Sequence, residues 1–129
     1  SRPLLLSPLA WPFTSRLSLV DPLYTAQEDF APYLNHMASM DIAIFLQTAW
    51  QCHLHDAWDY LYDIDIPVLI FAGERDAFTP LHCAKQMAER IPQSSLHILA
   101  EGSHAALIEQ PENINHQLAR FFETFPLQP

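Results

Sequence analysis

The sequence predicts an α/β fold, and three features of its second half indicate this class. Residues 67–72 (PVLIFA) and 96–100 (LHILA) are apolar runs of strand length. Each run is followed by residues with apolar side chains at helical spacing. The order strand, helix, strand, helix favours crossover connections and a parallel sheet. With 129 residues, 50% of them hydrophobic, the chain can form one core without disulfides or metal.

The first 25 residues contain one short aliphatic run. Leu4 to Leu6 precede Ser7 and a proline, which predicts a buried strand that ends near Ser7. A proline-interrupted loop is expected from there to Tyr24. We expect Thr25 or Asp29 to cap the helix that follows.

Two apolar stripes at helical spacing then predict helices with one buried face each. The first stripe consists of Phe30, Leu34, Met37, Met40 and Ile44, and the second of Leu46, Trp50, Leu54, Trp58 and Leu61. The second stripe ends at residues 63–67 (DIDIP). No glycine precedes Gly73, which favours helices joined by turns over a hairpin-rich sheet.

The helices of the second half have clear start signals. Thr79 is expected to be an N-cap and Pro80 the first helical residue, and Pro92 is expected to stop that helix. Its apolar face would contain Ala84, Met87, Ala88 and Ile91. Residues 101–110 (EGSHAALIEQ) are expected to be a loop, and Pro111 to begin the last helix. That helix would present Ile114, Leu118, Phe121 and Phe125 to the core.

Composition argues against several classes of partner. The chain has 15 acidic and 6 basic side chains, and its net charge of −9 would repel phosphate backbones and anionic lipids. The longest apolar runs are far shorter than the roughly 20 residues of a membrane helix, and no signal-peptide pattern begins at Ser1. We therefore expect no nucleic-acid partner and no membrane partner.

The two cysteines indicate free thiols rather than a disulfide framework or a metal site. Neither Cys52 nor Cys83 lies in a C-x-x-C pair, which favours a reducing compartment and a cytoplasmic protein. In a helix, Cys52 would share a face with His55 or Asp56, but no second cluster completes a tetrahedral set, so no metal is expected. His82 and Cys83 could lie near the rim of the sheet, but a surface pair at a helix start is the expectation.

Asp76 and His104 each follow a predicted strand by a few residues. The carboxyl ends of neighbouring parallel strands lie at one edge of a sheet, so these side chains are expected to meet there. An aspartate that accepts the Nδ1–H of an imidazole leaves Nε2 free to take a proton from a nucleophile. Gly73 is expected to permit the tight turn that presents Asp76. The alternatives are that Asp76 only caps a helix and that His104 is only solvated.

The stretch PVLIFAGERDAFTP, followed by a helix, a strand and EGSHAALIEQPE, resembles the C-terminal part of the α/β-hydrolase family. The resemblance implies that Asp76 is the acid and His104 the histidine of a catalytic triad, although Ser103 stands where many members have glycine. Glu109, with Pro111 and Glu112, matches the entry to the last helix. We read Glu109 as structural, bonding backbone N–H groups at the start of that helix.

The same resemblance implies a division of the chain and a type of reaction. Residues 1–66 would hold the sixth strand of the fold and a helical cap region, and residues 67–129 the last strands and helices. The implied reaction is hydrolysis of an ester, a lactone or a related acyl bond of a small apolar substrate, without a cofactor.

The sequence also departs from the family pattern. No G-x-S-x-G elbow occurs in the 129 residues, so the nucleophile is expected upstream of Ser1 and the chain alone is expected to be inactive. An upstream aspartate nucleophile, as in epoxide hydrolases and dehalogenases, is a second possibility. The acid groups would then be cap tyrosines such as Tyr24, Tyr33, Tyr60 or Tyr62. The third is a non-catalytic fragment or interaction module, whose open sheet edge binds the missing N-terminal half or a second copy.

Overall fold

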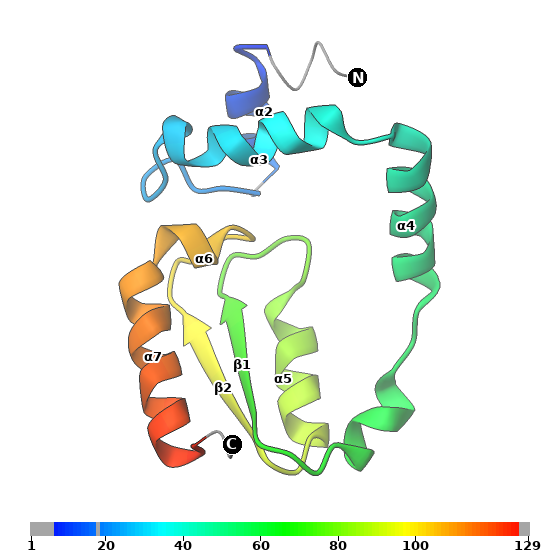
Figure 1. Ribbon diagram of the computed structural model, residues 1–129, viewed down its shortest axis with the longest axis vertical. Coiled ribbons are helices and arrows are strands. Elements are labelled where there is room, and N and C mark those ends of the chain that lie inside the picture. The colour runs from blue at the N-terminus through cyan, green and yellow to red at the C-terminus, as the bar shows by residue number, and fades with distance from the viewer. Residues whose placement is uncertain (1–6, 18, 127–129) are drawn as a thin grey trace.

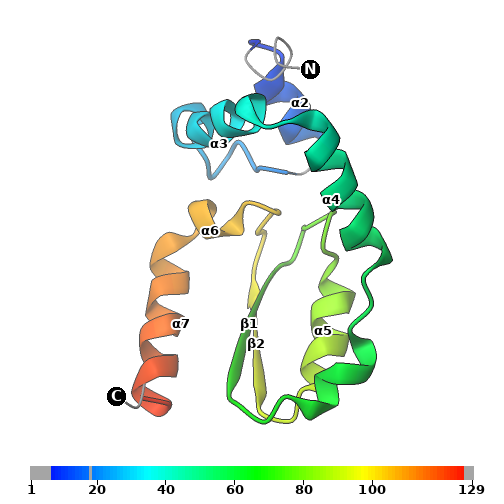
Figure 2. The ribbon, with the colours of Figure 1, turned by 45° about the vertical axis from the view of Figure 1, so that its right-hand side comes forward.

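The computed structural model describes residues 7–17 and 19–126. In these residues the sheet consists of β1 (Val68–Gly73) and β2 (Ser94–Leu99), and the two strands are parallel (Figure 1). Pairing is continuous from Val68 opposite Ser94 to Gly73 opposite Leu99. Helix α5 (Leu81–Arg90) connects the strands, and α7 (Pro111–Thr124) lies on the other side of the sheet (Figure 2). The predicted α/β class and parallel pairing are therefore confirmed.

The core of this unit lies between the sheet and α7. Leu99, Ala106 and Ile114 are buried together, and Phe71 and Leu118 pack against them. Pro111 is the first residue of α7, as predicted, because its missing N–H has no helical partner at that position.

The expected loop at residues 101–110 contains a short helix, α6 (Ala106–Glu109). Ala106 anchors this helix in the core and is only 6% exposed. The Ile108 amide donates to the Ala105 carbonyl at 2.9 Å and closes the turn. The prediction was wrong here because four residues are too short to show a helical period.

Helix α5 begins one residue later than the sequence predicts. Pro80 is its N-cap and Leu81 its first residue, whereas the Thr79 hydroxyl donates to the carboxylate of Asp76 instead of capping the helix. The C-terminal limit agrees with the prediction, since the helix ends at Arg90, before Pro92.

Helices α2 (Ala10–Arg16) and α3 (Gln27–Ser39) lie beyond the carboxyl ends of the strands (Figure 1). Their core is a cluster of buried residues, namely Ala10, Val20, Phe30 and Leu34, with Trp11 and Ala105 packed against it. The expected loop after Ser7 therefore contains α2, whose proline, Pro12, is tolerated because it lies in the first turn. The strand predicted at Leu4 to Leu6 lies outside the described residues.

Neither residue expected to cap α3 does so. The N-cap is Ala26, and it makes no side-chain capping bond. Asp29 lies inside the first turn, together with Glu28, where acidic side chains interact favourably with the helix dipole.

Helix α4 (Ile42–Leu54) contains the first part of the second apolar stripe together with Ile44 of the first, but it has no buried residue. Asp41 caps it by accepting from the amides of Ala43 at 2.8 Å and Ile44 at 3.4 Å. Leu46, Trp50 and Leu54 are 59%, 58% and 59% exposed, so the expectation of a buried face is wrong for the described residues. Figure 1 shows α4 apart from the sheet.

The α-helix that contains the second stripe also ends earlier than predicted. After Leu54 the Asp56 carboxylate accepts from the amide of Trp58 at 3.0 Å, and residues Trp58–Asp63 form the 3-10 helix η1. Within residues 7–17 and 19–126, each helix is too short or too polar to cross a lipid bilayer.

Candidate active site

The loops that follow β1 and β2 are held together by backbone hydrogen bonds. The amide of Glu74 donates to the carbonyl of Leu99 at 3.0 Å, and the amide of Arg75 donates to the carbonyl of Gly102 at 2.9 Å. Because the strands pair in register, both loops leave the sheet at the same level. Residues far apart in the sequence thus become neighbours at this edge.

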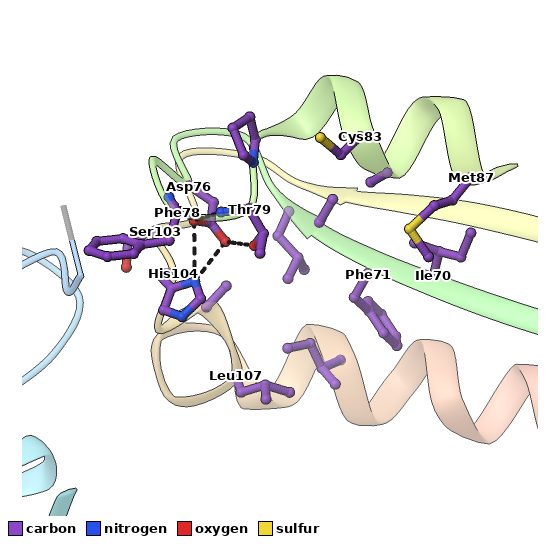
Figure 3. A pocket seen from close by; sticks show the side chains of 17 residues that line it. Ile70, Phe71, Asp76, Phe78, Thr79, Cys83, Met87, Ser103, His104 and Leu107 are labelled. Atoms are coloured by element: carbon purple, nitrogen blue, oxygen red, sulfur yellow. Dashed lines mark hydrogen bonds and ion pairs between the residues drawn. The ribbon is translucent and has the colours of Figure 1, made fainter. Parts of the chain in front are cut away.

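Asp76 and His104 lie in these two loops and contact each other. The Nδ1 atom of His104 is 3.0 Å from Oδ2 and 3.2 Å from Oδ1 of Asp76 (Figure 3). The Asp76 side chain is 8% exposed and the His104 side chain 41% exposed. When Nδ1 carries the proton, its N–H donates a hydrogen bond to Asp76. Nε2 then has no hydrogen-bond partner among the described residues and can accept a proton.

The Asp76 carboxylate also organises its own turn. Its Oδ1 atom accepts from the amides of Phe78 at 2.8 Å and Thr79 at 2.9 Å, and its Oδ2 atom accepts from the Thr79 hydroxyl at 2.5 Å. Burial alone would raise the pKa of Asp76, but these bonds and the bond from His104 outweigh it, so the pKa of Asp76 lies below its ordinary value. The turn-forming role and the contact with the imidazole therefore coexist in one side chain.

Gly73 contributes to this site through its lack of a side chain, whereas the prediction was that it permits a tight turn. No glycine in the described residues has a positive φ, so the turn does not need the conformational freedom of glycine. A Cβ atom on Gly73 would instead stand 2.5 Å from the carbonyl oxygen of Ser103 and 2.6 Å from that of Gly102. The absence of a side chain allows the His104 loop to pack directly on the end of β1.

Two cavities meet at His104. One, of about 470 Å³, extends along β1 and includes Asp76 together with Cys83 and Met87 from α5 (Figure 3). The other, of about 410 Å³, lies on the side of α3 and is lined mainly by apolar side chains, including those of Phe30 and Leu107. The imidazole is thus accessible from both.

Comparison with known proteins identifies the family. A family model of α/β-hydrolases, described as TAP-like protein, matches residues 38–128, which is more than half of the chain. The chain belongs to the α/β-hydrolases. The family assignment agrees with the resemblance of its strand-end motifs.

Individual relatives of this α/β-hydrolase cover it to different extents. The protein named "Putative carbamate hydrolase RutD" of Caulobacter sp. (strain K31) is 31% identical over 122 residues, which are 94% of this chain and 42% of the relative. The pimeloyl-(acyl-carrier protein) methyl ester esterase of Vibrio vulnificus (strain YJ016) is 33% identical over 66 residues, which are 51% of this chain and 26% of the relative. The chain thus spans less than half the length of either relative.

A solved structure shows the same fold. The serine hydrolase involved in carbazole degradation, the CarC enzyme, superposes with a TM-score of 0.74 and 17% sequence identity. The superposition covers 96% of this chain and 48% of the CarC chain. At this identity the likeness concerns the fold alone.

Only one of the tyrosines expected as acid groups in this α/β-hydrolase lies at the two cavities. Of the four tyrosines, Tyr33 shares a cavity with His104, whereas Tyr24, Tyr60 and Tyr62 line neither of the two. Within the described ranges, no group of three or more histidine, cysteine or acidic side chains is arranged to hold a metal ion.

Cys83 is partly exposed near the start of α5, next to His82, and it also lines the cavity beside β1. Its Sγ atom is 3.4 Å from Nε2 of His82, which is exposed. The helical spacing of Cys83, Ala84 and Met87 was the signal in the sequence, because these three residues lie on the face of α5 that borders the cavity.

Glu109 bonds backbone N–H groups, as predicted, but not those at the start of α7. The N-cap of α7 is Gln110, which makes no side-chain capping bond. The carboxylate of Glu109 accepts from the amides of Asp21 at 2.7 Å and Ser103 at 2.9 Å, and from the Ser103 hydroxyl. The prediction missed this because Asp21 lies 88 residues away in the sequence.

Proposed function

We propose that this chain supplies the acid and the histidine of a Ser-His-Asp hydrolase active site. The observation that carries the proposal is the contact between Asp76 and Nδ1 of His104 at the rim of two cavities, with Nε2 free. The nucleophile would come from the part of the protein that precedes Ser1, because the 129 residues contain no G-x-S-x-G elbow.

In this mechanism Nε2 of His104 takes the proton of the attacking hydroxyl as its oxygen forms a bond to the acyl carbon. The imidazolium then gives that proton to the leaving group when the bond to the leaving group breaks. Asp76 holds the ring in the required tautomer and stabilises its positive charge. The lowered pKa of Asp76 supports this role, because the carboxylate stays ionised in neutral solution.

The substrate class proposed is an ester, a lactone or a related acyl compound. The mainly apolar lining of the cavity beside α3 would suit an acyl chain or a ring. Two relatives support hydrolysis of this kind, since their names describe a carbamate hydrolase and a methyl ester esterase.

The cavity beside β1 supports a second part of the proposal. In the described residues β1 pairs only with β2, and its other edge borders this cavity. We expect the preceding part of the protein, which carries the nucleophile, to pair with this edge.

The free cysteines, Cys52 and Cys83, are consistent with a cytoplasmic location of the whole protein.

An aspartate nucleophile remains a second candidate because Tyr33 shares a cavity with His104. A phenol in that position would protonate the oxygen released from an epoxide. In this alternative His104 would activate the water that hydrolyses the covalent intermediate.

A fluorophosphonate probe separates these alternatives in the full-length natural protein that contains this chain. A serine nucleophile would form an adduct, and Asp76→Asn would slow the reaction by up to roughly 10⁴-fold because the imidazole is held in the wrong tautomer. Asp65→Asn, an exposed change far from the site, is the matched control. Absence of an adduct together with turnover of an epoxide or a haloalkane would refute the serine mechanism. Absence of both activities would favour a non-catalytic binding module.

A further inference from the structure

Glu109 is a buried carboxylate that the proposed reaction does not use. It is 8% exposed, and in the described residues it has no ion-pair partner. Its Oε1 atom accepts from the Asp21 amide at 2.7 Å and from the Ser103 hydroxyl, while Oε2 accepts from the Ser103 amide at 2.9 Å. Burial of a charge is costly unless such donors compensate it, so the three donors and the carboxylate depend on one another.

The contacts of Glu109 reach the backbone amides of the two residues that flank His104. On one side it binds the amide of Ser103 directly. On the other side the amide of Ala105 donates to the Ser103 hydroxyl oxygen at 3.0 Å. That hydroxyl has one proton, and it lies closer to Glu109 than to the Leu19 carbonyl at 3.4 Å, so Glu109 orients it.

The hydrogen bond from the Asp21 amide to Glu109 joins the His104 loop to the α2–α3 region. Asp21 follows Val20, which is 1% exposed in the cluster of α2 and α3, and Ala105 packs against the same cluster. Phe30 belongs to this cluster and also lines the cavity beside α3. One carboxylate therefore links a wall of the cavity to the loop that carries the imidazole.

We propose that Glu109 is a positioning residue, whose carboxylate fixes the His104 loop against the α2–α3 region and so places the imidazole between Asp76 and the cavity. This inference rests on the proposed function of His104. It differs from a merely structural role, because it requires that loss of the carboxylate alter the His104 ring itself.

The test is two-bond ¹H–¹⁵N NMR of the histidine rings in the full-length natural protein, with His104 assigned from the His104→Gln variant. Glu109→Gln is the informative change, because a glutamine of the same size has one acceptor oxygen for three donors. Glu112→Gln is the matched control, since this exposed residue of α7 lies three positions further on. Asp76→Asn separately tests the pairing on which the proposed function depends.

In the unchanged protein and in Glu112→Gln, we expect His104 to show the tautomer with a proton on Nδ1 and a detectable Nδ1–H signal. In Glu109→Gln we expect loss of that signal and averaging of the tautomers, while the amide signals of β1 and α5 persist. A His104 spectrum unchanged by Glu109→Gln would overturn the inference. A tautomer unchanged by Asp76→Asn would instead overturn the proposed function.

Ser103→Ala gives a second test if Glu109→Gln does not fold. This variant keeps the Ser103 amide but removes the hydroxyl that joins Glu109 to the Ala105 amide. We expect a weakened Nδ1–H signal of His104. An unchanged signal in this variant would also overturn the inference.

Discussion

The carbonyl oxygen of Ser103 lies where it would collide with any side chain on Gly73, only 2.5 Å from the position of a Cβ atom. This approach brings the end of β1 against the residue that precedes His104. The contact between Asp76 and His104 therefore depends on a glycine that takes no part in the chemistry.

Gly73→Ala is expected to destabilise the protein by about 1–3 kcal/mol, because the added methyl group forces two backbone segments apart. Gly102→Ala is expected to cost less. A Cβ atom there would meet its nearest atoms at 3.0 to 3.2 Å, and two of these atoms are the side-chain Cβ atoms of Leu99 and Ala106. Urea unfolding of both variants checks this order. Equal stability of the two would contradict the account of Gly73.

Thr79→Val is expected to raise the pKa of Asp76 toward its ordinary value, because it removes the hydroxyl that donates to Oδ2. The lowered pKa means that ionised Asp76 stabilises the fold above its unfolded-state pKa, and that this contribution is lost as the pH falls through the folded-state pKa. In Thr79→Val this contribution would be smaller, and its loss would be complete at a higher pH. The titration of the Asp76 carboxyl carbon by ¹³C NMR measures the shift.

Thr48→Val is the control for this titration. The Thr48 hydroxyl donates to the carbonyl of Ile44 at 2.9 Å, on α4, so its removal affects no carboxylate. If Asp76 titrated at the same pH in the Thr79→Val protein and in this control, the hydroxyl of Thr79 would not be a cause of the lowered pKa.

The 129-residue chain by itself is expected to self-associate. Helix α4 exposes Leu46 and Trp50, and a helix that is apolar on most sides is normally covered. The double change Leu46→Gln and Trp50→Gln is expected to shift sedimentation profiles toward the monomer. Phe122→Gln, which alters an exposed residue of α7, is expected to leave them unchanged. Monodisperse monomers of the unchanged chain would disprove the expectation.

Cys83 is expected to react with N-ethylmaleimide more slowly in the full-length natural protein than in the 129-residue chain. The reason is that the cavity it lines borders the open edge of β1, which the rest of the fold is proposed to cover. Mass spectrometry of Cys52→Ser proteins follows this single thiol of the chain, with the unfolded proteins as the reference. Equal rates in the two folded proteins would argue against coverage of that edge.

The elements that could be predicted from the sequence have local signals. The apolar runs at residues 67–72 and 96–100 indicated the two strands, which the structure places at residues 68–73 and 94–99, and α7 begins at a proline. The proximity of Asp76 and His104 also followed from local information, because each comes a few residues after a strand and the two strands are neighbours.

The features that could not be predicted depend on contacts between distant residues. Helix α2 owes its place to packing on Phe30, and the role of Gly73 depends on a loop 30 positions further along the sequence. Asp21, whose amide donates to Glu109, lies 88 residues away from it in the sequence. The apolar stripe of α4 correctly indicated a helix, but a stripe does not specify what covers it.

The continuous pairing of β1 and β2 has a consequence for insertions and deletions among natural relatives. One extra residue within either strand, or between a strand and its site residue, would displace Asp76 or His104 by about 3.3 Å relative to the other. This shift exceeds the 3.0 Å that separates Nδ1 from Oδ2. Variation in chain length between the two residues is therefore expected in α5 and in the turn that follows it, while residues 68–76 and 94–104 keep their lengths.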